Sequence, residues 1–326
     1  LDMFSKNLES RGVKVHWAKD AQEFNEIVLG ILKDHNVKKM VKSKSMLTEE
    51  CEMNPYLEQH GIDVVETDLG ERIIQLLGQK PSHIVMPAIH LKREEVGKMF
   101  EEKGISKEIG NYDPTYLTRC ARHHLRDQFM EAGAGMTGCN FGVAATGDCV
   151  VCTNEGNADM TTSMPKLHIV AMGIEKLVPD YKSLAVFQRL LCRCGTGQPT
   201  TAFTSHFRQA RPGAEMHVVL VDNGRSDILA DKDHWQTLKC MRCGACMNTC
   251  PVYRRSGGYS YTYFIPGPIG VNLGMLKNPQ KYSDNVSACT LCLSCDNVCP
   301  SKVGPGSQIY AWRQSLERLG KANPVK

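Results

Sequence analysis

The sequence predicts a mixed α/β protein in two parts: a layered α/β domain over residues 1–229, followed by a smaller helical domain over residues 230–326. Two observations predict the first part. Short apolar runs alternate with amphipathic stretches up to about residue 102, and strand-like segments follow residue 133. The second part is set apart because eight of the 15 cysteines lie between residues 240 and 299.

The first apolar runs predict strands separated by helices, and therefore a mostly parallel sheet. These runs are residues 13–17, 40–41, 62–65 and 84–86. Residues 114–132 then predict a helix, because apolar side chains recur at helical spacing after Asp113, a typical helix start before proline.

After Gly133 the pattern changes to that of strands. The expected strands are residues 139–146, 149–153, 168–172, 200–207 and 216–221, with one helix near residues 184–191. Residues 231–234 form a polar hinge candidate. Residues 235–240 and 310–319, beyond it, are expected to be helical.

Composition excludes several classes of protein. Hydrophobic residues make up 42% and charged residues 23%, which is typical of a packed globular chain. The net charge is +4 and no block of basic residues stands out, so nucleic acid is not an expected partner. Residues 256–276 carry no charge, but their glycines and prolines predict an ordered loop rather than a membrane span. No leader pattern opens the chain, so we expect a cytoplasmic location.

The strongest motif is a cysteine spacing that occurs twice. The two copies read Cys240-x2-Cys243-x2-Cys246-x3-Cys250-Pro251 and Cys289-x2-Cys292-x2-Cys295-x3-Cys299-Pro300. In bacterial ferredoxins this spacing holds two 4Fe-4S clusters, and the fourth cysteine of each run binds the other cluster. The predicted ligand sets are therefore Cys240, Cys243, Cys246 and Cys299 for one cluster, and Cys289, Cys292, Cys295 and Cys250 for the other. The alternative is a pair of structural zinc sites, which do not require this spacing followed by proline.

A series of further motifs carries a family resemblance. In order they are Lys42-Ser-Lys-Ser-Met46, Glu66-Thr-Asp-Leu-Gly-Glu71, Pro81-Ser-His-Ile84, Pro87-Ala-Ile-His90, Thr137-Gly-Cys-Asn-Phe141, Thr153-Asn-Glu-Gly-Asn157 and Asp222-Asn-Gly-Arg225. With the cysteine motifs, they make the chain resemble the lactate-utilisation iron-sulfur protein B family, over essentially its whole length. Members of that family have an LUD domain followed by a two-cluster ferredoxin-type module.

The resemblance implies a fold and a function. The LUD domain is expected to be a layered sheet related to ribose-5-phosphate isomerase and CoA-transferases. The chain is expected to be an iron-sulfur electron-transfer subunit of an L-lactate dehydrogenase complex, an oxidoreductase subunit rather than a stand-alone enzyme. The implied partners are a cysteine-rich CCG-domain subunit and a small LUD-domain subunit. Any association with a membrane would be made through these partners. Family members are longer at both ends, so we expect this chain to be a piece of a longer protein.

An alternative function belongs to another class. The chain could be a non-catalytic iron-sulfur redox sensor or scaffold whose LUD domain binds a small metabolite. Reduction of the clusters by lactate in the presence of partners distinguishes the two.

Charged and polar residues of the matched motifs follow predicted strands, where α/β sheets place their ligand crevices. The candidate crevice residues are Lys42, Lys44, Glu66, Asp68, Glu71, His83, His90, Glu155 and Asn157. The alternative is a structural network of ion pairs.

Oxidation of lactate needs a base for the hydroxyl group and a cation for the carboxylate. The candidates are the bases His90, His123, His124 and His168 and the cations Arg119, Arg122 and Arg126. No nicotinamide or flavin site is evident. Residues 133–138 match G-x-G-x-x-G with Glu155 downstream, but a predicted helix precedes them and a β-type segment follows, the reverse of the dinucleotide-binding context.

Two features remain open. Cys149 and Cys152, with Cys192 and Cys194, are a candidate third metal site, which departs from the apolar strand usual in the family; buried or surface thiols are the alternative. The uncharged aromatic segment 259–266 is a candidate partner interface, and shielding of the clusters from water is the alternative.

Overall fold

The computed structural model describes residues 1–320 and divides the chain into two compact units. The first unit comprises residues 1–79, 91–186 and 201–223, and the second comprises residues 80–90, 187–200 and those from 224 onward. The predicted mixed α/β fold with a parallel sheet is confirmed. The two units do not follow the contiguous split at residue 229, because two segments from the first part of the sequence pack within the second unit.

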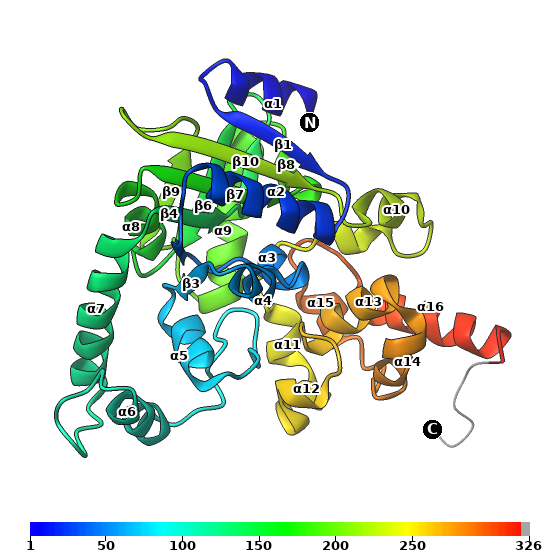
Figure 1. Ribbon diagram of the computed structural model, residues 1–326. Coiled ribbons are helices and arrows are strands. Elements are labelled where there is room, and N and C mark those ends of the chain that lie inside the picture. The colour runs from blue at the N-terminus through cyan, green and yellow to red at the C-terminus, as the bar shows by residue number, and fades with distance from the viewer. Residues whose placement is uncertain (321–326) are drawn as a thin grey trace. The chain divides into compact units, whose positions relative to one another are not determined.

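A six-stranded parallel sheet forms the centre of the first unit (Figure 1). Its strands, in spatial order, are β1 (Lys14–Ala18), β10 (Glu215–Val221), β7 (Leu167–Gly173), β4 (Ala134–Gly138), β2 (Lys39–Lys42) and β3 (Asp63–Glu66). Every neighbouring pair is parallel. The expected strands 13–17, 40–41, 62–65, 168–172 and 216–221 all lie in this sheet, with ends shifted by a residue or two.

Both faces of this sheet are covered, as the apolar strands require. Side chains alternate along β7, so that Ile169 and Ala171 enter one core cluster while Val170 and Met172 enter another. The first cluster includes side chains from the helix α2 (Ala21–Asp34), and the second includes Phe4 of α1 (Asp2–Glu9).

A second, four-stranded sheet has the order β8-β5-β6-β9. Its strands are β5 (Phe141–Val143), β6 (Asp148–Thr153), β8 (Leu177–Val178) and β9 (Phe203–Phe207). The expected strand 139–146 is shorter than predicted, since only residues 141–143 form β5.

The remaining helices of the first unit are short, apart from α7. They are α3 (Met46–Glu50), α4 (Met53–Gln59), α5 (Leu69–Leu77), α6 (Arg93–Glu102), α7 (Pro114–Glu131), α8 (Asn157–Ser163) and the 3-10 helix η1 (Ile174–Lys176). Asp68 caps α5 by accepting a hydrogen bond from the backbone N–H of Glu71 at 3.1 Å, and Asp113 caps α7 in the same way. Helix α9 (Tyr181–Thr196) begins in the first unit and ends in the second.

The regular secondary structure of the second unit, over its described residues, is helical. Its helices are α10 (Arg225–Ala230), η2 (Trp235–Lys239), α11 (Ala245–Thr249), α12 (Pro251–Ser256), η3 (Gly258–Ser260), α13 (Gly267–Lys277), α14 (Pro279–Ser287), α15 (Ser294–Val298) and α16 (Pro305–Arg318). Helices α13, α14 and α16 contribute Val271, Val286 and Ile309 to a small apolar core. The expected helical character of residues 235–240 and 310–319 is confirmed, with the first as a 3-10 helix.

Two sequence predictions are wrong. Residues 84–86 form a bend rather than a strand, because the backbone N–H groups of Val85 and Met86 both donate to Nδ1 of His83, which folds the segment back. The uncharged stretch 256–276 is not wholly a loop, since α13 occupies its second half. At Gly270 a Cβ atom would lie 1.7 Å from the carbonyl oxygen of Ile265, so this glycine permits close packing of the helix.

Among residues 1–320, no helix is long and apolar enough to cross a membrane.

Candidate metal centre

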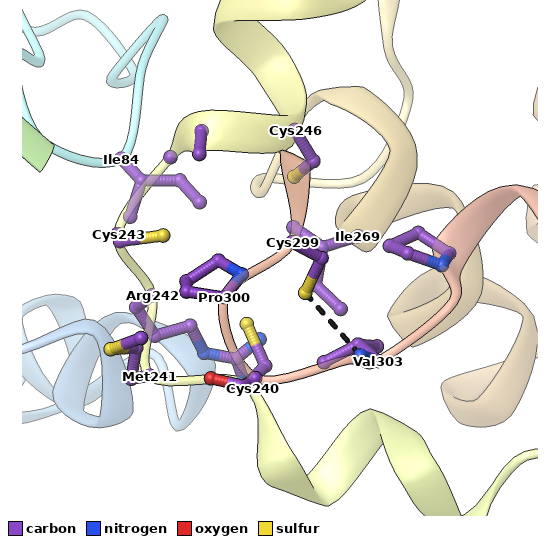
Figure 2. A pocket seen from close by; sticks show the side chains of 14 residues that line it. Ile84, Cys240, Met241, Arg242, Cys243, Cys246, Ile269, Cys299, Pro300 and Val303 are labelled. Carbon is purple, nitrogen blue, oxygen red and sulfur yellow. Dashed lines mark hydrogen bonds between the residues drawn. The ribbon is translucent and has the colours of Figure 1, made fainter. Parts of the chain in front are cut away.

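Four thiols from the two cysteine motifs line one pocket of the second unit (Figure 2). They are Cys240, Cys243, Cys246 and Cys299, the set predicted for one cluster. The pocket has an empty volume of about 370 Å³, counting its opening to solvent. Three thiols of the first motif and the last thiol of the second motif therefore share one space, as crossed ligation requires.

Short helices place these thiols. Cys240 directly follows η2, and Gly244 precedes α11, which carries Cys246. Cys299 follows α15. Gly244 has φ of +79°, and a Cβ atom there would lie 3.3 Å from the ring of His83, so the turn between the helices needs glycine.

The wall of this pocket is mostly apolar, with Ile84, Ile269 and Val303 among its residues. Burial raises the pKa of the Cys243 thiol to about 11, and burial raises that of Cys246 well above its usual value. A bound metal reverses this effect, because a coordinating thiol is deprotonated. The backbone N–H of Val303 donates to Sγ of Cys299 at 3.3 Å, a contact of the kind that tunes metal-bound sulfur (Figure 2).

The other predicted set is also gathered in space. Cys289 interacts electrostatically with Cys250 and Cys292, and Cys295 with Cys250 and Cys289. Burial raises the pKa of Cys295 to about 12. By contrast, Cys292 is exposed, and a backbone hydrogen bond from Ser294 lowers its pKa. This second set is therefore more open to water at one corner.

The two motifs share an unusual backbone. Arg242 in the first motif and Leu291 in the second have φ of 64° and 55°, and both directly precede the second cysteine of their motif. The residue directly after that cysteine is Gly244 in one motif and Leu293 in the other, with φ of 79° and 56°. Left-handed conformations at non-glycine residues carry strain and concentrate at functional sites. The sequence repeat is thus also a repeat of backbone shape.

Residues 80–90 add a loop to the second unit that the sequence did not associate with the cysteines. Ile84 lines the first pocket, and Nε2 of His83 lies 3.2 Å from the Asn248 side chain. His90 lies between Ser82 and the hydroxyl group of Tyr259, at 2.7 and 3.0 Å. His83 and His90 were expected in a crevice of the α/β domain, but the structure places both in the second unit. No local motif signals this contact, because it joins segments some 160 residues apart.

The aromatic segment 259–266 is partly internal. Tyr263 is 8% exposed and packs against Phe264 and Tyr282. Tyr261 interacts electrostatically with the thiols of Cys250 and Cys289. The shielding interpretation suits these two rings better than the partner interface does, whereas Tyr259 is 53% exposed.

The four cysteines of the suggested third metal site fall in different units. Cys149 is buried in the second core cluster of the first unit, beside the thiol of Cys139, while Cys152 on the same strand is partly exposed. Cys192 and Cys194 lie on the part of α9 that belongs to the second unit, where Cys194 interacts with Cys243 and Cys299. The third metal site stays a prediction.

Most of the expected crevice residues do gather in the first unit. At the carboxyl ends of the paired strands β2 and β3, Nζ of Lys42 lies 2.7 Å from a carboxylate oxygen of Glu66, and both side chains are almost fully buried. Lys42 also donates to the hydroxyl group of Thr48 at 2.9 Å. Lys44 lies 3.4 Å from Glu71. The expected charges therefore form ion pairs with one another.

Further predicted residues border this cluster. A carboxylate oxygen of Glu155 accepts from the backbone N–H of Leu69 at 3.0 Å, and the Asn157 amide donates to the Thr67 hydroxyl group at 3.3 Å. Asp68, which caps α5, interacts electrostatically with Glu155. The strand ends bring these residues together, although they are some 90 positions apart in sequence.

Carboxylates outnumber lysines in this charged cluster, and the pKa values of two of the carboxyl groups are raised. Burial, reinforced by the neighbouring Glu49, raises the pKa of Glu71 to about 8. Burial raises the pKa of Glu49 as well. Burial alone would lower the pKa of Lys42, but the carboxylates of Glu66 and Glu49 raise it. Glu49, which follows the Lys42–Met46 motif, is not among the predicted crevice residues, because it lies on a short helix rather than directly after a strand.

The expected bases and arginines are not assembled into one site. Arg119, Arg122, His123 and Arg126 are exposed on α7, and His124 lies 2.9 Å from a guanidinium nitrogen of Arg72. His168 is buried within β7 beside the Thr137 hydroxyl group, and burial lowers its pKa to about 3, so it is a neutral core residue at physiological pH.

Residues 133–138 are mainly strand β4, preceded by α7. A Cβ atom at Gly135 would lie 1.8 Å from the carbonyl oxygen of Thr161, so this glycine serves the packing of α8 on the sheet. The G-x-G-x-x-G match therefore has a structural explanation.

Comparison with known proteins agrees with this arrangement. The LUD domain family matches residues 1–227, and the 4Fe-4S dicluster domain family matches residues 236–303. The second match confirms the prediction of iron-sulfur clusters over a pair of zinc sites.

Individual relatives cover nearly the whole chain. A lactate utilization protein B from Macrococcus caseolyticus is 44% identical over 334 residues, which span 100% of this chain and 69% of the relative. One from Bacillus cytotoxicus is 43% identical over 99% of this chain and 69% of its own. The uncharacterized electron transport protein YkgF of Escherichia coli K12 is 40% identical over 98% of this chain and 68% of its own. A solved structure, a DUF162 family protein from Deinococcus radiodurans, aligns over 68% of this chain and 94% of its own, with 11% identity and a TM-score of 0.37.

Proposed function

The chain belongs to the lactate utilization protein B family, and we propose that it is the electron-transfer subunit of a complex that oxidises L-lactate to pyruvate. In this proposal it carries electrons through two 4Fe-4S clusters. The Escherichia coli relative described as an electron transport protein supports the same role.

The observation that carries the proposal is the pocket shared by thiols from both motifs. Three come from the first motif, and Cys299 comes from the second. Four thiols are the donor set of a 4Fe-4S cluster, so the residues present fit the group. A bound cluster supplies one-electron transfer at a potential set by its surroundings.

The chain's own residues would bind the two clusters, shield them from water and tune their reduction potentials. Cys240, Cys243, Cys246 and Cys299 would hold one cluster, and Cys289, Cys292, Cys295 and Cys250 the other. Ile84 and Ile269 line the first pocket with apolar surface, and the N–H of Val303 would stabilise charge on Cys299.

We further propose that the charged cluster at the ends of β2 and β3 binds a small carboxylate metabolite. Lys44, whose side chain is 20% exposed, supplies a cationic group, and Glu71, with its raised pKa, can hold or release a proton near neutral pH. The same cluster supports the alternative function, a redox sensor whose LUD domain binds a metabolite.

The proposed partners are the CCG-domain subunit and the small LUD-domain subunit. A chain that carries electrons must receive them and pass them on, so it is expected to work within a complex. The exposed Tyr259, in the same segment as the partly buried Tyr261 and the buried Tyr263, is a candidate for a partner contact.

The test is anaerobic reduction of the clusters. The chain, purified with the two partners, should show bleaching of its iron-sulfur absorbance on addition of L-lactate, and D-lactate serves as the matched control. Bleaching by dithionite but not by lactate would favour the sensor instead. A Lys44→Gln variant that keeps the wild-type melting temperature and still bleaches with dithionite, but no longer with lactate, would connect the charged cluster to substrate binding, because Lys44 is less buried than Lys42.

A further inference from the structure

Three histidines and one glutamate meet at the amino-terminal ends of β1 and β10, outside the residues used above. They are His16 on β1, Glu215 and His217 on β10, and His35 at the end of α2. Helix α2 begins just after the carboxyl end of β1 and returns along the sheet, which brings His35 back to the amino-terminal end. The cluster therefore follows from the strand-helix-strand topology and has no local sequence motif.

Three of these side chains present ligand atoms to one point. Nε2 of His217 lies 2.6 Å from Oε1 of Glu215, and Nε2 of His35 lies 3.4 Å from the same oxygen. Within the described residues 1–320, these are the three histidine, cysteine or acidic side chains whose donor atoms all lie within 4.8 Å of one another. Two imidazoles and one carboxylate are the donor set of open zinc sites.

The tautomer of His35 suits it to bind a metal. Its Nδ1 lies 2.8 Å from the carbonyl oxygen of Ile31. A carbonyl oxygen only accepts, so Nδ1 carries the proton and Nε2 keeps its lone pair in neutral imidazole. That lone pair faces a carboxylate oxygen, and two acceptors at this distance require a proton or a cation between them.

A second imidazole, that of His16, orients the His217 ring on the side away from Glu215. Its Nδ1 lies 2.9 Å from Nε2 of His16, and the His217 side chain is only 4% exposed. When Nδ1 of His217 donates to His16, Nε2 is free to bind a metal, as in sites where an outer partner orients the ligating histidine. Burial lowers the pKa of both rings, which keeps them neutral and able to bind.

The site is open on one side. The side chains of His35 and Glu215 are 32% and 34% exposed, so an ion can enter and retain water in a remaining position. Lys14 competes, because its Nζ lies 2.5 Å from Oε1 of Glu215. Its side chain is 55% exposed, so the ammonium group can move into solvent when a cation arrives.

We propose that His35, Glu215 and His217 bind a divalent transition-metal ion of the zinc class, with His16 as a positioning residue. The bound ion would link the end of α2 to strand β10. All four residues belong to the first unit, so the site is independent of the thiol pockets and of the proposed electron transfer.

The test is Zn²⁺ binding to the full chain with its iron-sulfur clusters loaded, kept anaerobic. Equilibrium dialysis against excess Zn²⁺ should leave one zinc ion per chain with iron content unchanged. The His35→Ala and Glu215→Gln variants should bind zinc at least about tenfold more weakly, since each loses a ligand. Absence of bound zinc, or zinc taken up only as iron is lost, would overturn the proposal.

His60→Ala is the matched control. His60 also ends a helix and contacts the carbonyl oxygen four residues before it, at 2.8 Å, but it belongs to no ligand set. Zinc binding should be unchanged in this variant, and equal losses in His60→Ala and His35→Ala would contradict the site. Melting temperatures without zinc check the fold, and a zinc-induced rise in melting temperature should occur in the wild type and in His60→Ala only.

The role of His16 has its own readout. His16→Leu should weaken zinc binding by roughly 10-fold to 100-fold, whereas His16→Asn, which keeps a polar partner for His217, should restore part of it. Equal binding by wild type and His16→Leu would remove His16 from the proposal.

Discussion

The thiol sets of the second unit and the charged cluster of the first unit differ in how their buried groups are neutralised. Buried thiols such as Cys243 and Cys246 have raised pKa values and gain their charge only with a metal. Lys42 and Glu66 are buried as well, but each neutralises the other at 2.7 Å. The comparison indicates that the thiol region depends on a bound group for its stability, whereas the charged region is stable by itself.

Removal of iron is the strongest test of this difference. A chelator should abolish hydrogen-exchange protection in residues 240–299 and leave it in strands β7 and β10, because the second unit has a small apolar core while the sheet is packed on both faces. Hydrogen exchange of the loaded and the iron-free protein, followed by mass spectrometry, measures this loss of protection. Equal loss of protection in both regions would contradict the comparison.

Single thiol substitutions test which cysteines hold each cluster. Cys299→Ala should remove the cluster held mainly by the first motif, and Cys250→Ala the one held by the second, so each should lower iron from about eight atoms per chain to about four. Iron analysis gives the number, and electron paramagnetic resonance of the reduced protein shows which signal remains. Cys194→Ala is the control, since Cys194 lies near Cys299 but outside both motifs. Loss of the same signal in Cys250→Ala and Cys243→Ala would exclude the crossed arrangement, which assigns Cys243 and Cys250 to different clusters.

The buried ion pair should be sensitive to loss of one partner. Lys42→Met leaves the Glu66 carboxylate buried without its cation, so the free energy of unfolding of the first unit should fall by about 3–5 kcal/mol. Lys39→Met is the matched control on the same strand, because Lys39 pairs with Glu131 at the surface and should contribute at most about 1 kcal/mol. Urea unfolding followed by hydrogen exchange in β2 and β3 measures both. Equal effects would mean that burial of the pair is unimportant.

The same contrast explains what could be predicted from the sequence. The thiol sets are specified by short local spacings, so the eight cysteines could be assigned to two sets from the sequence, and the four of the first set line one pocket. The sheet was predictable because runs such as residues 216–221 must be buried on both faces. The contacts of His83 with the cysteine region, and the cluster around His35 and Glu215, join residues distant in sequence. Residues 84–86 were mistaken for a strand because an apolar run does not reveal that His83 turns the backbone.

Glu71 gives the smallest expected effect of the charged cluster, because its contribution to the free energy of unfolding depends on pH. Burial and Glu49 raise its pKa in the folded protein to about 8, from an ordinary value of 4.5. Between these values the folded state holds a proton that the unfolded state has released, so the free energy of unfolding falls as pH rises through this window.

Glu71→Gln lacks this proton, so its stability relative to wild type should increase from pH 5 to pH 8. Melting temperatures of the loaded protein across that range measure the difference, with Glu102→Gln, at the exposed end of α6, as the control that stays flat. A constant difference between Glu71→Gln and wild type would mean that Lys44, 3.4 Å away, keeps Glu71 charged. Glu71 and Lys44 would then neutralise each other as Lys42 and Glu66 do, and the contrast between the charged cluster and the thiol sets would be larger than the pKa of Glu71 indicates.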